Sequence, residues 1–244
     1  MRNLWVIAER EYKHFFISPI AYLVALTILL FLGIRFYIII LASAMQQYAP
    51  TVPDVVGPLF MLLIFTVPAI SMRLLAEESK NGTLELLLTA PVRDWEVVVG
   101  KWLGGFLFLL TVIAITWFFP AILNQIIDPG IDQGLMVTFY LGIALVAAAF
   151  VAIGVMASSL FSNQIAALFA TLGLLFVLLL IGDSSQVMGA AGANSLLAYL
   201  DIDNHFYGSF MTGVIELKDV VYYLSVTALA LFIGSSVVEM RRWR

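Results

Sequence analysis

The chain has 244 residues, of which 62% are hydrophobic and 11% are charged, and its mean hydropathy is +1.03. Soluble domains average roughly 45–50% apolar and about 25% charged residues, so the composition points to a chain whose main solvent is lipid. The net charge of −4 leaves no basic surface for nucleic acid, and the absence of cysteine excludes disulfides, thiolate metal sites and thiol nucleophiles.

Residues 1–19 have the spacing of an amphipathic helix. On a helical wheel the aromatic residues fall on one stripe and the basic residues Arg10 and Lys13 lie opposite. Such a helix lies flat at the level of the lipid headgroups, and Pro19 ends it. It is either an anchor that sets the depth of the first span or an elbow that transmits movement of a cytoplasmic partner. Its aromatic residues are Trp5, Tyr12, Phe15 and Phe16.

Six apolar stretches are long enough to cross a hydrocarbon core of about 30 Å as helices. Pro58 and Pro68 in the second and Pro120 in the third predict kinks. We therefore predict an all-α, polytopic membrane protein that forms a single transmembrane domain over residues 1–244. The predicted spans are residues 20–41, 55–72, 102–127, 135–160, 165–182 and 220–238.

The basic residues predict the orientation. With the N-terminus inside, ten of the twelve Lys and Arg residues fall on cytoplasmic segments, and the outer loops keep Lys218 alone. Both termini are then cytoplasmic, residues 73–101 form an inner loop and residues 183–219 form an outer loop. The spacing of apolar residues in the outer loop predicts one or two short helices, and we interpret His205 there as a packed loop histidine rather than a ligand.

Arg35 is the remaining basic residue, and it lies about 22 Å into the first span at a rise of 1.5 Å per residue. An intramembrane charge is a functional candidate. Arg35 either snorkels to the outer headgroups beside Tyr37 or contacts a substrate or a subunit. By contrast, Ser158 and Ser159 in the fourth span are better interpreted as helix-packing contacts than as a polar conduit.

The inner loop predicts a helix, a sharp turn and a second short helix before the third span. Asn81-Gly82 is a helix C-cap signal, Thr83 can cap the second helix, Pro91 ends it, and Asp94 can cap the helix that follows. The second helix either packs under its own bundle or inserts into a groove on another protein. Its leucines are Leu84, Leu86, Leu87 and Leu88, and its acidic flank is Glu77, Glu78 and Glu85.

This loop resembles the coupling loop of ABC-2-type transporter permeases. The pattern is Glu77-Glu78-x-x-x-Gly82-Thr83-x-Glu85-x-Leu87-x-x-x-Pro91, running into Gly100-Lys101. Within the family it is most similar to the gliding-motility-associated (GldF-like) permease subunits. Their opening resembles Glu9-Arg10-Glu11-x-x-x-Phe15-Phe16-x-Ser18-Pro19, and their tail resembles His205-Phe206-x-x-x-Phe210-x-x-Gly213 followed by Asp219-Val-Val-Tyr222-Tyr223.

The resemblance implies a permease of the bacterial cytoplasmic (inner) membrane that works as an exporter, in which two permease units pair as a homo- or heterodimer and separate cytoplasmic ATPases dock on the inner loops. The implied coupling residues are Glu77, Glu78, Gly82, Thr83, Glu85, Leu86, Leu87 and Pro91. The chain itself has no Gly-x-x-x-x-Gly-Lys-Ser/Thr phosphate loop, so we expect no ATPase activity in it and expect ATP and Mg²⁺ in the partner.

A second hypothesis is a mechanical transmitter that drives an extracytoplasmic machine, or a partner's extracytoplasmic domain, without passing a solute. An intramembrane enzyme is disfavoured because none of the six predicted spans contains Asp, His or Cys. A channel is disfavoured because the sequence shows no acidic ring or carbonyl-rich filter motif.

Overall fold

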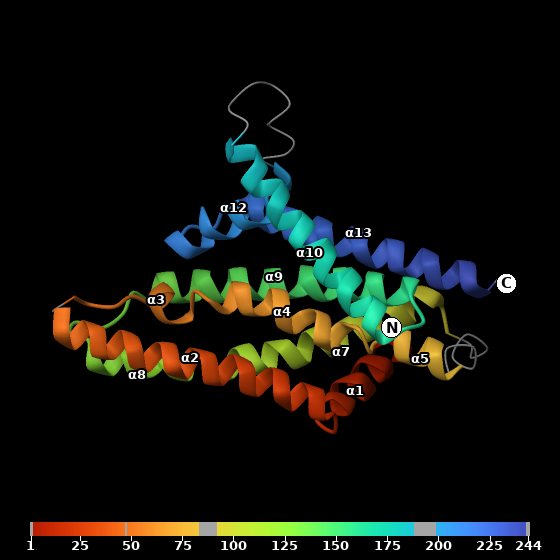
Figure 1. The fold of residues 1–244 in the computed structure, drawn as a ribbon, viewed down its shortest axis with the longest axis horizontal. Coiled ribbons are helices and arrows are strands. Elements are labelled where there is room, and N and C mark those ends of the chain that lie inside the picture. Colours follow the sequence, from red (N-terminus) through yellow and green to blue (C-terminus); the bar gives the residue numbers. More distant parts are fainter. Residues whose placement is uncertain (1, 47, 83–91, 188–198, 243–244) are drawn as a thin grey trace.

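The computed structural model describes residues 2–46, 48–82, 92–187 and 199–242, and within these ranges it contains helices and no strand (Figure 1). This confirms the all-α prediction. The helices are α1 (Arg2–Phe15), α2 (Pro19–Gln46), α3 (Val52–Val56), α4 (Leu59–Ser71), α5 (Ala76–Asn81), α7 (Asp94–Ile115), α8 (Phe118–Ile126), α9 (Gln133–Leu160), α10 (Gln164–Val187), α12 (Ile202–Tyr207) and α13 (Leu217–Arg242), with a 3-10 turn η1 (Phe210–Thr212).

Six helical segments in the described residues are long and apolar enough to cross a membrane, as the sequence predicted. They are Pro19–Met45, Val52–Asn81, Asp94–Ile126, Gln133–Leu160, Gln164–Ile181 and Leu217–Arg241. The second and third segments are longer than the predicted apolar stretches because helical turns with charged residues continue them at the end that holds α1 and α5. The chain is therefore a multi-pass membrane protein.

The fourth segment, α9, is the centre of the bundle. In its most apolar window 78% of the residues are buried, against 22% in α2 and 17% in α10, and it packs against α4, α7, α10 and α13. Its middle contains small residues, among them Ala147, Ala152 and Gly154. Because small side chains let helix backbones approach closely, α9 can be surrounded by four partners.

Pro120 breaks the third segment in two, where the sequence predicted a kink. A proline has no N–H group, so the carbonyl of Thr116, four residues earlier, cannot receive its usual helical hydrogen bond. That carbonyl instead accepts the N–H of Phe119 at 3.1 Å, and α7 ends at Ile115. The Thr116 hydroxyl is buried and lies 3.1 Å from the hydroxyl of Tyr140 on α9, which holds the break against the central helix.

Pro58 breaks the second segment in the same way, and a side chain from another helix satisfies the carbonyl that it frees. The helical partner of the Asp54 carbonyl would be the N–H of residue 58, which proline lacks. Nε of Arg35 on α2 donates to this carbonyl at 2.7 Å. Arg35 thus ties α2 to α3, a contact that neither of the two interpretations from sequence included.

The two ends of the bundle carry different elements. Figure 1 shows α1, α5 and the C-terminal part of α13 at one end, and α3 and α8 at the opposite end, with α12 on that side of the bundle. Both α12 and η1 fall within the segment where the sequence predicted one or two short helices. This arrangement fixes which residues can meet at each end.

The contact between Arg35 and Pro58 leads to a test by paired substitution. Arg35→Leu removes a charged donor from a carbonyl in the bundle, and we expect it to lower the free energy of unfolding by about 1.5–3 kcal/mol. In a Pro58→Ala background the loss should be much smaller, because the alanine supplies the missing N–H group. The measurement is denaturant unfolding of all four proteins in detergent micelles. An Arg35→Leu loss of the same size in both backgrounds would contradict the assignment.

Candidate coupling site

The N-terminal helix α1 packs along α7. Ala8 and Phe15 are buried, the ring of Phe15 stacks on that of Phe108 at 5.0 Å, and the Tyr12 hydroxyl lies 3.0 Å from Oγ1 of Thr111. Of the four predicted aromatic residues, Trp5 and Phe16 stay exposed at 58% and 41%. The helix therefore forms as predicted, but part of its aromatic face packs against α7.

Gly104 on α7 makes this contact possible. A Cβ atom at this position would lie 2.6 Å from Cβ of Glu11 and 3.0 Å from the carbonyl oxygen of Ala8. Both distances are too short for a side chain, and the second atom belongs to the backbone and cannot turn away. Glycine at residue 104 is thus required for α1 to sit against α7.

Four charged side chains meet where α1, α5 and α7 come together, and we call them the ion cluster: Arg10, Glu11, Glu78 and Lys101. Nζ of Lys101 lies 2.9 Å from Oε1 of Glu11 and 2.8 Å from Oε1 of Glu78. Nη2 of Arg10 lies 3.0 Å from the same oxygen of Glu11 and 3.3 Å from that of Glu78. Two cations and two anions therefore bridge three helices that are far apart in sequence.

The burial of the ion cluster is uneven. The Lys101 side chain is 2% exposed and that of Glu11 is 11% exposed, whereas that of Arg10 is 57% exposed. Burial acts to raise the pKa of Glu11, but the ammonium of Lys101 and the guanidinium of Arg10 outweigh it and hold the pKa below its ordinary value. Glu11 is therefore ionised and is paired with a buried cation.

Hydrogen bonds also connect α5 and the residues just before it to other parts of the bundle. Nε of Arg73 donates to Glu77 at 2.8 Å, and Nη1 of Arg73 donates to the hydroxyl of Ser18 at the start of α2. From α13, Nη1 of Arg241 donates to Oγ of Ser79 at 2.6 Å. Among the predicted coupling residues, Glu78 therefore contacts α1 and α7 directly, whereas Glu77 pairs with Arg73, whose guanidinium in turn contacts Ser18.

Ser158 of α9 caps the start of α5. Its hydroxyl oxygen accepts the backbone N–H groups of Leu75 at 3.1 Å and Ala76 at 2.9 Å. The first N–H groups of a helix lack partners within that helix, so this side chain replaces a local cap. This confirms the interpretation of Ser158 as a helix-packing contact and links α5 to the central helix.

Gly82 ends α5 with φ of 70° and ψ of 4°, the left-handed conformation that glycine adopts readily, so the predicted C-cap is confirmed. The other predicted coupling residues, Thr83, Glu85, Leu86, Leu87 and Pro91, lie outside the described residues. The prediction that Asp94 caps the following helix is wrong. That helix begins at Asp94, and the carboxylate of Glu96 accepts the backbone N–H of Arg93 at 3.0 Å, because a side chain three residues into the helix can reach back to its start.

A cavity of about 460 Å³ lies beside the ion cluster, between α1 and α5. Its wall includes Lys13, His14, Arg73 and Asn81 in addition to the four cluster residues. Both signs of charge line it, which suits polar side chains of another protein better than an apolar ligand. Among the described residues, no three histidine or carboxylate side chains are grouped so that they could hold a metal ion.

The structure thus brings α1 together with Glu78 of the predicted acidic flank, whereas Arg35 lies apart, in its contact with α3. Sequence reasoning missed Glu11 and Lys101 as partners. A signal was available: Lys101 follows Gly100 inside an apolar run, and a lysine in that position needs a buried carboxylate. The sequence does not say which of the glutamates supplies it.

Comparison with known protein families identifies the family of the chain. The sequence model of the ABC-2 family transporter protein matches residues 5–238, which is nearly the whole chain. No curated protein matches the chain.

Replacing Lys101 tests the importance of the ion cluster. Lys101→Met removes the buried cation that contacts both Glu11 and Glu78, and we expect a loss of about 3–5 kcal/mol in the free energy of unfolding. Lys13→Met is the matched control, because Lys13 pairs with Glu9 in an exposed contact and should cost at most about 1 kcal/mol. Denaturant unfolding measures both, and equal losses would contradict the role of the ion cluster.

The lowered pKa of Glu11 predicts an acid-dependent contribution. A carboxyl whose pKa is lower in the folded state stabilises that state above its ordinary value of 4.5, and loses this effect as the pH falls through the folded-state pKa. Wild-type protein should therefore be more stable than the Glu11→Gln variant near neutral pH, and the difference should shrink below about pH 4.5. Thermal unfolding of both proteins across this range measures it, and a difference that grows on acidification would refute the pairing.

Proposed function

The chain belongs to the ABC-2 family of transporter proteins, and from this premise we propose that it is the permease subunit of an exporter driven by a separate cytoplasmic ATPase. Membership of the family makes it a membrane subunit of an ABC transporter. The direction of transport, the docking of the ATPase and the residues that receive it are the parts that we propose.

The proposed orientation places α1, α5 and the C-terminal part of α13 on the cytoplasmic side of a bacterial inner membrane. The positive-inside rule supports it, since ten of the twelve Lys and Arg residues then face the cytoplasm. The grouping of these elements at one end of the bundle agrees with a single cytoplasmic face.

The observation that carries the coupling proposal is the set of bonds from α5 and the segment before it to other helices. Ser158 joins this region to α9, Arg241 joins it to α13, and the ion cluster joins it to α1 and α7. A force applied at the turn after α5 would therefore act on several membrane-spanning helices at once. That is what a coupling element between an ATPase and a permease must do.

The docking element itself is proposed from the sequence that follows Gly82. Leu86 and Leu87 would enter an apolar groove on the ATPase, and Glu85 with Glu77 would face basic residues at its edge. The chain has no phosphate loop of its own, so ATP and Mg²⁺ would bind to the partner. Closure of the ATPases would then move the inner loops and alternate access between the two sides.

The complete transporter would contain a second permease unit. In the most apolar stretches of α2, α10 and α13, only 22%, 17% and 28% of the residues are buried. These helices therefore present much apolar surface that lipid or another subunit can cover. Within the family we place the chain nearest the gliding-motility-associated subunits, on the pattern that runs from His205 to Tyr223.

Glu85→Lys tests the docking element. Reversing this charge should place it against basic residues of the ATPase, where like charges repel. We expect at least about a tenfold fall in the amount of ATPase that copurifies from native membranes, which corresponds to about 1.4 kcal/mol. Glu85 is preferred to Glu78 for this test because Glu78 pairs with Lys101, and its reversal would also disrupt the ion cluster.

The matched control is Glu216→Lys, which reverses an exposed glutamate in the predicted outer loop. It should leave the copurified ATPase unchanged. If both variants retain the ATPase, the docking element is wrongly assigned. ATP-dependent uptake into inverted sealed vesicles then tests export. Turnover of ATP with no accumulated solute, dependent on an extracytoplasmic partner, would favour mechanical transmission instead.

A further inference from the structure

The cavity beside the ion cluster has two walls of different chemistry. On α1, residues three and four positions apart lie on one side of the helix, and the basic residues that line the cavity there are Arg10, Lys13 and His14. On α5, the lining residues are Glu77, Glu78 and Asn81. The cavity therefore presents a row of basic side chains on one helix and a pair of carboxylates on the other.

The charges around this cavity balance. Among the described residues its lining contains four Lys and Arg side chains and three glutamates: Arg10, Lys13, Arg73 and Lys101, with Glu11, Glu77 and Glu78. A fourth carboxylate, that of Glu9, does not line the cavity but pairs with Lys13 at 2.6 Å. A ligand with a single charge would leave one wall without a counter-charge, whereas a zwitterion matches both walls.

Side chains on both walls can be reached from outside. Those of Arg10 and Lys13 on α1 are 57% and 70% exposed, and that of Glu77 on α5 is 31% exposed. Lys101, at 2%, is enclosed by the ion cluster and is not available to a ligand. The volume of about 460 Å³ lies within the range of roughly 300–1,000 Å³ that is usual for small-molecule sites.

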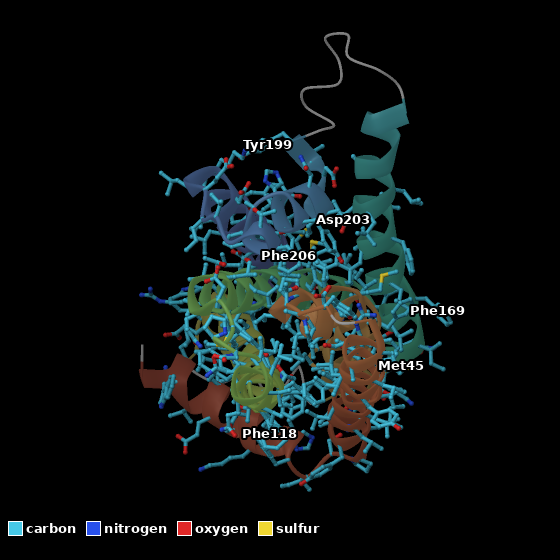
Figure 2. The ribbon with its side chains drawn as sticks, turned by 90° about the vertical axis from the view of Figure 1, so that its left-hand side faces the viewer. Met45, Phe118, Phe169, Tyr199, Asp203 and Phe206 are labelled. Carbon is cyan, nitrogen blue, oxygen red and sulfur yellow. The ribbon has the colours of Figure 1, made fainter. Side chains whose placement is uncertain are left out.

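Apolar residues continue the cavity towards the lipid-facing side of α2. Ile17 lines the cavity at the turn between α1 and α2 and is 78% exposed. The exposed side chains of Tyr22 and Leu23 follow on α2, and in the most apolar stretch of this helix only 22% of the residues are buried. In Figure 2, which looks along the bundle from the end that holds α3 and α8, α1 (dark red) runs obliquely across the lower edge of the molecule. An amphipathic helix at the level of the headgroups has this kind of orientation.

We propose that this cavity binds the headgroup of phosphatidylethanolamine. The phosphate lies towards Arg10 and Lys13, the ammonium lies towards Glu77 and Glu78, and the acyl chains follow α2 from Ile17. Guanidinium and ammonium groups donate strong hydrogen bonds to phosphate, and pockets with basic residues beside membrane-spanning helices bind lipid headgroups. A carboxylate offers about four acceptor positions, so Glu77 can keep its bond with Arg73 and also accept from the lipid.

The choice of headgroup follows from the α5 wall. A primary ammonium has three N–H groups that a carboxylate can accept, whereas the trimethylammonium of choline has the same charge and no N–H group. A glycerol headgroup leaves the carboxylates without a cation. A bound lipid would join α1 to α5 beside the ion cluster. This inference does not depend on the ATPase or on the direction of transport.

The test is lipid binding by the full chain, purified in a nonionic detergent and measured by native mass spectrometry. The probes are phosphatidylethanolamine and phosphatidylcholine with identical acyl chains, which share the phosphate and the net charge. We expect the ethanolamine lipid to bind at least about tenfold more tightly. Equal affinities would overturn the proposal.

A third probe distinguishes a lipid from a soluble zwitterion. Glycerophosphoethanolamine carries the same headgroup without acyl chains, and we expect it not to displace the lipid at equal concentration. Displacement at equal concentration would show that contacts with α2 contribute nothing, which would overturn the assignment to a lipid.

Two substitutions separate the roles of the walls. Glu77→Gln should reduce the preference for ethanolamine over choline, because the ammonium loses a charged acceptor. Lys13→Met should weaken the binding of both lipids alike, because both carry the phosphate. The matched control is Glu216→Gln, which neutralises an exposed glutamate that also pairs with a basic neighbour, Lys218, and should change neither affinity. A preference that survives Glu77→Gln unchanged, or that Glu216→Gln reduces equally, would contradict the proposed site.

Discussion

The buried ammonium of Lys101 is the constraint on which the end of the fold that holds α1 and α5 depends. A lysine that is 2% exposed must be paired, and its two partners come from α1 and α5, which lie 90 and 23 residues away in sequence. Satisfying one charge therefore fixes three helices relative to one another. The close approach of α1 at Gly104 is the steric counterpart, because it places Glu11 directly against the helix that carries Lys101.

Backbone carbonyl groups in the bundle must also find bonding partners. Inside lipid each freed carbonyl must find a donor within the protein, and the two proline breaks find theirs differently. At Pro120 the chain tightens and a nearby N–H group supplies the bond, whereas at Pro58 the donor is Arg35 from another helix. An arginine within an apolar span thus has a structural reason to be there, and a pattern that treats each span separately cannot show it.

The contrast between local patterns and contacts across the bundle explains what could be predicted from sequence. The six spans follow from length and hydropathy, and Gly82 follows from a local preference for the left-handed conformation. The contacts of Lys101 with Glu11, of Arg35 with the Asp54 carbonyl and of Ser158 with α5 join residues 19 to 90 positions apart. Hydropathy and helical periodicity report on one element at a time, so they identify the residues with an unmet bonding requirement but not the partners that meet it.

Both ends of the molecule meet on α9. Ser158 binds the start of α5, and the ring of Phe139 contacts that of Phe206 on α12. The two residues are 19 positions apart on one continuous helix, which corresponds to about 28 Å at a rise of 1.5 Å per residue. Because α9 is the most buried of the six segments, the helices packed around it oppose bending. A movement of α5 that keeps the bonds of Ser158 would therefore shift α9, and with it the ring of Phe139 against which Phe206 packs. The retention of those bonds would make α9 the physical connection between the two sides of the membrane.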